Sequence, residues 1–150
     1  MTVLLTLLAA CVTWDGTWIF TFDANSEIAG DCAEDTGDDS TTTQTGNAAT
    51  FVDIYRTGDG GVVVLLEQAL KGEVSGNAID CEWSQQTESD TYKEKHQISM
   101  SGTTEAGVLS GEVEDETWAE DEEGADYNCR ETWGYTAERT VSPADRYVGN

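Results

Sequence analysis

Alternating apolar and polar positions recur along the chain and predict an all-β protein. The clearest alternation lies in residues 14–22 and 92–101, and in the first of these Trp18, Phe20 and Phe22 share one face. Because successive side chains of a strand point to opposite faces, a period of two indicates strands with one apolar face. No segment has the period of ~3.6 residues that is typical of an amphipathic helix. We therefore expect short strands joined by turns.

Glycine-containing turns separate the other apolar segments, which we interpret as further strands. Turns are expected at 57–61, 75–77 and 102–107. The polar, threonine-rich segment 23–50 is expected to form a long loop with a short hairpin inside it. The strands expected after this loop are 51–55, 62–66, 70–74 (a continuation of 62–66 or a separate strand), 78–86, 92–101, 108–118 and 127–138.

About seven or eight strands predict one antiparallel meander, closed as a small barrel or folded as a β-sandwich. Gly16-Thr17-Trp18 opens the first strand, and this motif together with the meander resembles the lipocalin-type (calycin) barrels. The resemblance implies a small lipocalin-like barrel in which Trp18 closes one end. We expect a single β domain over residues 18–141, followed by a tail at 142–150.

The first ten residues form an apolar segment that ends in small residues just before Cys11. They read MTVLLTLLAA, which is too short to span a bilayer and has the form of a signal-peptide core. Leu8-Ala9-Ala10-Cys11 resembles the lipobox of bacterial lipoproteins. That resemblance implies removal of residues 1–10, acylation of Cys11 (palmitate among the acyl groups), and a short tether at 11–17 that holds the domain on a membrane. The alternative is a buried first strand made from the same residues.

A lipoprotein of this kind is exported, so we expect it at the outer membrane, at the cell surface or in the periplasm. The chain has 30 acidic and 7 basic residues, a formal net charge of −23. Association with nucleic acid depends on Lys and Arg that neutralise phosphates, so this charge excludes nucleic acid as a partner. Besides the membrane, a small apolar ligand or another envelope protein is the expected partner.

The cysteines suggest a structural disulfide. If Cys11 is acylated, Cys32, Cys81 and Cys129 remain, and export favours a disulfide between two of them. Cys81 and Cys129 both lie on apolar faces of expected strands, which favours a bond between them. A Cys32–Cys129 bond is the alternative, because the end of the first strand lies near the start of the last one if these two strands pair antiparallel.

No pattern of catalytic residues stands out, and we expect that the protein is not an enzyme. His96 is the only histidine, and the motifs of serine hydrolases, P-loop proteins and zinc proteases are absent from the sequence. We interpret His96 as a hydrogen-bonded residue on a sheet face. The candidate ligand-facing residues are those on the aromatic inner face of the expected strands: Trp18, Phe20, Trp83, His96, Trp133 and Tyr135.

Calcium is the one cofactor that the acidic loops suggest, because hard cations take several oxygen ligands from a flexible loop. The candidate ligands are Asp31, Glu34, Asp35, Glu122 and Glu123. Three hypotheses follow for the function. The first is a lipid-anchored, non-enzymatic binding or structural module of a cell envelope. The second is a calcium-stabilised adhesion or envelope protein, and the third is a secreted hydrolase that uses paired carboxylates.

Overall fold

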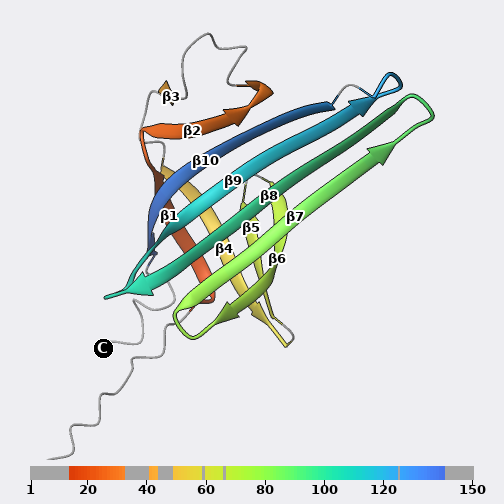
Figure 1. Cartoon of the computed structure of the whole chain (residues 1–150). Coiled ribbons are helices and arrows are strands. Elements are labelled where there is room, and N and C mark those ends of the chain that lie inside the picture. Colours follow the sequence, from red (N-terminus) through yellow and green to blue (C-terminus); the bar gives the residue numbers. More distant parts are fainter. Residues whose placement is uncertain are drawn as a thin grey trace, which may run out of the picture.

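The structure is a computed structural model that describes residues 14–32, 41–43, 49–58, 60–65, 67–124 and 126–140. Within these ranges, ten strands form one antiparallel sheet (Figure 1). The strands are β1 (Gly16–Phe22), β2 (Asn25–Gly30), β3 (Thr41–Thr43), β4 (Ala49–Thr57), β5 (Gly60–Leu65), β6 (Gln68–Ser75), β7 (Ala78–Glu88), β8 (Tyr92–Glu105), β9 (Val108–Asp121) and β10 (Asp126–Arg139).

Eight of these strands close into a barrel with the architecture of a lipocalin-like fold. Their order is β1-β4-β5-β6-β7-β8-β9-β10, and β10 pairs back onto β1 from Phe22↔Tyr135 to Trp18↔Arg139. Closure of this kind removes the free edges of a sheet. The predicted all-β meander and its barrel form are therefore confirmed, and the sandwich alternative is wrong.

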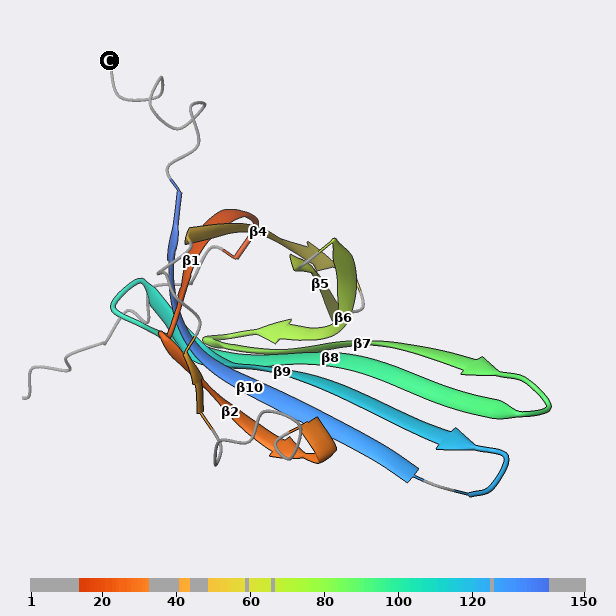
Figure 2. The ribbon, with the colours of Figure 1, turned by 90° about the horizontal axis from the view of Figure 1, so that it is seen from above.

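Four of the barrel strands continue past the barrel wall as a flat extension. The pairing of β6 with β7 ends at Lys71↔Glu82, whereas the pairing of β7 with β8 continues to Glu88↔Lys93. The last four strands, β7 to β10, project beyond the closed part of the barrel (Figures 1 and 2). The structure therefore has a barrel end and an extension end.

The segment 23–50 contains the predicted short hairpin, formed by β2 and β3. It does not begin as a loop, however, because β2 continues the course of β1 and pairs with the first half of β10. Two extra residues on this side, between Phe22↔Tyr135 and Glu27↔Thr132, form a bulge. The bulge shifts the pairing register with β10 by two residues. Because side chains also alternate with a period of two, the inward-facing residues of β2 lie on the same face as those of β1.

The predicted turn at 102–107 is shorter than expected. β8 runs to Glu105 and only Ala106 and Gly107 form the turn, with φ of 51° and 85°. Likewise β9 continues to Asp121, three residues beyond the predicted end of that strand. Both strands are longer because they pair with each other over their full length, and ladder hydrogen bonds hold polar residues in a strand despite their low β propensity.

Among the residues that the structure describes, seventeen buried apolar ones fill the barrel. The alternation predicted this face correctly on several strands: Trp18 and Phe20 on β1, and Cys81 on β7, all point inward and are at most 2% exposed. The ring centroids of Phe20 and Tyr135 lie 4.7 Å apart in a stacked arrangement. Phe22, Trp83 and Trp133 are partly buried and pack against the end of this core that faces the extension.

Two glycines allow the wall of the barrel to bend between β8 and β9. Gly102 and Gly111 lie directly opposite each other on inward-facing positions. A Cβ atom at Gly111 would overlap the carbonyl oxygen of Ser101, and one at Gly102 would overlap the hydroxyl of Tyr135. Glycine at such sites permits close approach of backbone and side chain.

The disulfide joins Cys32 to Cys129, with the Cα atoms 5.0 Å apart. The pairing that the sequence favoured, Cys81 with Cys129, is wrong. Both residues point to the inner face as expected, but β8 and β9 lie between their strands, which are therefore about 14 Å apart at ~4.8 Å per strand. The alternative is confirmed, since β2 brings Cys32 to the beginning of β10.

Candidate functional site

The barrel end is closed by aromatic side chains from the start of the described chain. Trp14 is fully buried, and its Nε1 donates a hydrogen bond to the carbonyl of Gly76 at 3.1 Å. The Nε1 of Trp18 donates to the carbonyl of Trp14 at 2.9 Å. The Nε of Arg139 donates to the carbonyl of Asp15 at 3.0 Å. Trp18 thus closes one end, as the lipocalin resemblance implied.

The opposite end carries a group of aromatic and polar side chains, which we call the inner-face cluster: Ser26, Trp83, His96, Asp115 and Glu131. They come from five strands, β2 and β7 to β10. All five side chains lie on the face of the sheet that continues the barrel interior. Each is an even number of residues from a buried, inward-facing residue of its own strand, or lies opposite an inward-facing position of the paired strand, and such positions share one face. The cluster thus begins where the packed core ends.

His96 connects an aromatic and an acidic member of this cluster. Its Nε2 lies 2.7 Å from Asp115 Oδ1, with the two side chains 36% and 30% exposed. Its ring meets that of Trp83 edge to face, with centroids 5.2 Å apart. Asp115 lies on β9, the strand next to that of His96, two residues from the position directly opposite His96. Long side chains can span this diagonal separation. The interpretation of His96 as a hydrogen-bonded residue on a sheet face fits this geometry.

A second carboxylate lies beside the first. Glu131 is directly opposite Asp115 on the neighbouring strand, so the two Cβ atoms are about 5 Å apart. Glu131 has its own partner, because the Oγ of Ser26 donates to its Oε1 at 2.5 Å. Ser26 is 1% exposed and reaches Glu131 because the bulge keeps β2 in phase with β10. Each carboxylate is therefore held by a separate hydrogen-bond donor.

Three of the six predicted ligand-facing residues lie at this open end, and three do not. Trp83, His96 and Trp133 are partly exposed there, while Trp18, Phe20 and Tyr135 are buried in the core. The sequence did not single out Ser26, Asp115 or Glu131. The alternation that places Leu109 and Val113 on the inward face also places Asp115 there, so its orientation could have been predicted. Its neighbours could not, because they depend on the register across four strands.

Three of the acidic residues proposed as calcium ligands, Asp31, Glu122 and Glu123, lie in the described part of the chain. Asp31 Oδ2 accepts the backbone N–H of Asn128 at 2.5 Å, and Glu122 and Glu123 occupy the exposed turn between β9 and β10. Glu34 and Asp35 lie outside the described residues. Among the residues that the structure describes, no three His, Cys, Asp or Glu side chains are grouped to hold a metal ion.

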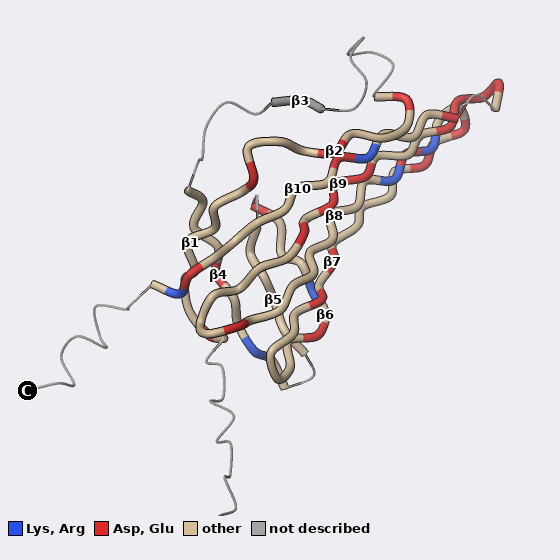
Figure 3. Tube along the Cα trace, turned by 60° about the vertical axis from the view of Figure 1, so that its left-hand side comes forward, with Lys and Arg blue, Asp and Glu red and all other residues tan. Residues whose placement is uncertain are grey.

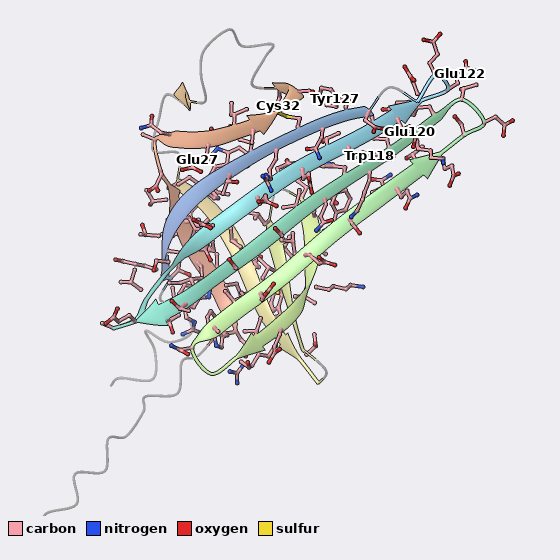
Figure 4. The ribbon with its side chains drawn as sticks, viewed as in Figure 1. Glu27, Cys32, Trp118, Glu120, Glu122 and Tyr127 are labelled. Atoms are coloured by element: carbon pink, nitrogen blue, oxygen red, sulfur yellow. A yellow bond between two sulfur atoms is a disulfide. The ribbon has the colours of Figure 1, made fainter. Side chains whose placement is uncertain are left out.

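The outer face of the extension differs from the inner face. Acidic residues occur along the extension up to its tip (Figure 3). Trp118, half-buried, lies on the outer face, on the same strand as Glu120 (Figure 4). Figure 4 also places Tyr127 near Cys32, at the start of β10. Trp118 is in phase with Glu116, which accepts a hydrogen bond from the Nδ2 of Asn128 at 3.3 Å. Trp118 is thus on the side opposite to Trp83.

The thiol of Cys81 is 1% exposed in the core. Burial raises its pKa to about 11, and the nearby charge of Asp80 adds to this rise. Burial likewise raises the pKa of Tyr135, whose hydroxyl donates to the carbonyl of Ser101 at 3.1 Å. A thiol that stays protonated and covered is a structural residue rather than a nucleophile.

Comparison of the chain with family models, with curated proteins and with solved structures finds no match. No helix among the described residues is long and apolar enough to cross a membrane. Cys11 and the rest of the lipobox lie outside the described residues.

Proposed function

We propose that the protein is an exported, lipid-anchored binding module of a cell envelope, without enzymatic activity. In this proposal Cys11 carries the lipid and the inner-face cluster binds a small ligand with an apolar part. The observation that supports it is the polarity of the fold: the chain enters at the closed end of the barrel, and the partly exposed aromatic residues lie at the other end.

The anchor fits this polarity. Trp14 is buried at the closed end and follows Cys11 by three residues, which span about 10 Å when extended. A lipid on Cys11 would hold the closed end near the membrane and direct the acidic extension away from it. This orientation also keeps the carboxylates of the extension away from anionic headgroups, which would repel them.

The binding surface fits a ligand that is partly apolar. The barrel core is occupied by buried side chains, so the ligand is expected at the mouth rather than deep inside. There Trp83 and Trp133 offer apolar surface, while His96 and the Asp115 carboxylate offer hydrogen-bonding groups. Ligand sites often lie at the mouths of β-barrels and combine apolar surface with a few placed polar groups.

Mass spectrometry of the protein from its native membrane fraction tests the anchor. We expect a chain that begins at Cys11 and carries a diacylglycerol, and a Cys11→Ser variant that remains unprocessed. An intact chain that begins at Met1 in the soluble fraction would contradict the anchor without affecting the ligand site.

Fluorescence titration with N-phenyl-1-naphthylamine, a neutral apolar probe, tests the ligand site. We expect saturable binding, weakened about tenfold or more by Trp83→Ala, since truncating a central aromatic contact costs on the order of 1–2 kcal/mol. Trp118→Ala is the matched control, because it removes an equally large half-buried ring from the opposite face of the sheet. Equal effects of the two substitutions would contradict this site.

A further inference from the structure

The outer half of β7 is an edge strand with one neighbour. β6 pairs with β7 only from Ala78 to Glu82, and β8 alone pairs with Trp83 to Glu88. Among the described residues, no other strand pairs with this half of β7, which forms one margin of the extension in Figures 1 and 2. The opposite margin is covered by β2 and β3. One side of the extension is therefore open to pairing.

This edge lacks the features by which proteins usually block edge pairing. Such features are lysine or proline on the edge strand, a β-bulge, or a very short strand. Residues 83–88 read WSQQTE, which contains no lysine and no proline, and its single charged residue is Glu88 at the outer end. The register with β8 runs from Trp83↔Ile98 to Glu88↔Lys93 without a bulge. The segment is regular, and its residues from Ser84 onward are exposed.

Charge is unusually balanced around this edge. Lys71, Lys93 and Lys95 are three of the seven basic residues in the chain, and each is a cross-strand neighbour of β7, opposite Glu82, Glu88 and Gln86 respectively. Lys93 Nζ lies 4.0 Å from Glu88 Oε1. In a chain with a net charge of −23, this is a place where a second, equally acidic copy can approach with little local repulsion.

We propose that two copies of the chain pair through this edge, with β7 of one copy antiparallel to β7 of the other. A two-fold axis perpendicular to the sheet, at Gln86, places Gln86 opposite its own copy and Ser84 opposite Glu88. This register pairs residues of the free edge only, whereas an axis at Gln85 would place Glu88 of one copy at Glu82 of the other, where β6 already occupies the edge. The inner-face clusters of both copies then lie on the same side of one continuous sheet.

Sedimentation equilibrium of the full chain tests this proposal. We expect a dimer for the wild type and a monomer for Gln86→Lys, which places two ammonium groups opposite each other at the axis. Thr91→Lys is the matched control, since it adds the same charge at an exposed position outside the ladder, and it is expected to remain dimeric. A wild-type monomer, or a dimer that Gln86→Lys leaves intact, would overturn the proposal.

Oxidative cross-linking tests the register without relying on a destabilising substitution. Gln86→Cys is expected to form an intermolecular disulfide, because its Cβ atoms meet across the axis. Gln85→Cys lies opposite Thr87 of the other copy and is expected to give no more cross-linked dimer than the wild type. The reverse result would overturn the register.

Hydrogen exchange and salt dependence complete the test. The amides of residues 83–88 are expected to exchange more slowly as the protein concentration rises. The dimer fraction is expected to rise when salt increases from ~0.01 M to ~0.1 M, because the Debye length falls from ~30 Å to ~10 Å and screens the repulsion between the two net charges. A monomer in which these amides exchange slowly would show that another segment covers the edge, and would also overturn the proposal.

Discussion

The contact between Gly102 and Tyr135 allows a quantitative test of the packing in the barrel. In a Gly102→Ala variant, the new Cβ atom would overlap the Tyr135 hydroxyl and would lie 2.8 Å from the Ser110 carbonyl oxygen and 3.1 Å from Leu109 Cδ1. Tyr135 is 2% exposed and has no room to move toward solvent. The hydroxyl must therefore leave the carbonyl of Ser101, to which it donates at 3.1 Å.

The expected loss of stability has two parts. Overpacking by one methyl group costs about 1–3 kcal/mol, and breaking the hydrogen bond of a buried hydroxyl costs about 1 kcal/mol more. We expect Gly102→Ala to lower the free energy of unfolding by about 3 kcal/mol, which is roughly a 6–12 °C lower Tm for a domain of this size. Urea unfolding followed by tryptophan fluorescence measures it.

A double-mutant cycle distinguishes this contact from a general intolerance of alanine. Tyr135→Phe removes the hydroxyl that the new methyl group overlaps, so Gly102→Ala should cost ~1–2 kcal/mol less in that background. Gly58→Ala is the control, because a Cβ there meets no atom within 4 Å, and it is expected to be nearly neutral. Additive losses in the cycle, or a loss below about 0.5 kcal/mol for Gly102→Ala, would refute the reasoning.

Three further predictions concern the disulfide, the buried thiol and the inner-face cluster. Replacing Cys32 and Cys129 together by Ser should lower the free energy of unfolding by about 4–5 kcal/mol, measured by urea unfolding, because the bond closes a loop across a sequence separation of 97 residues. Since the pKa of Cys81 is raised from 9.0 to about 11 in the folded protein, its contribution to stability is complete below pH 9 and is lost as the pH rises toward 11. Cys81→Ala should make the fall in unfolding free energy between pH 9 and pH 11 shallower, and the remaining fall is the part due to Tyr135. A slope identical to that of the wild type would contradict the raised pKa of Cys81. Ser26→Ala should cost about 1–2 kcal/mol, because it removes a nearly buried donor from Glu131, whereas Ser84→Ala on the exposed edge should cost almost nothing in equilibrium unfolding of the monomer.

The pattern of apolar and polar residues was enough to predict the eight barrel strands and their faces. The alternation that places Trp18 and Phe20 on one side of β1 is a local property, because it depends only on the two-residue period of an extended backbone. The number of barrel strands and the closing role of Trp18 also followed from local patterns and from the lipocalin resemblance. The ends of β8 and β9 did not, since their last residues are polar and stay extended only through pairing with each other.

Tertiary structure alone decided which residues meet. Cys81 and Cys129 have the same orientation in the sequence pattern, yet two strands separate them, while Cys32 reaches Cys129 through a strand that the pattern treated as a loop. The pairs His96–Asp115 and Ser26–Glu131 likewise depend on the registers of β8 with β9 and of β2 with β10, and on the bulge between β1 and β2. Periodicity fixes the face of a side chain, but the neighbour across the sheet is set by register, and register is a property of two strands that are distant in the chain.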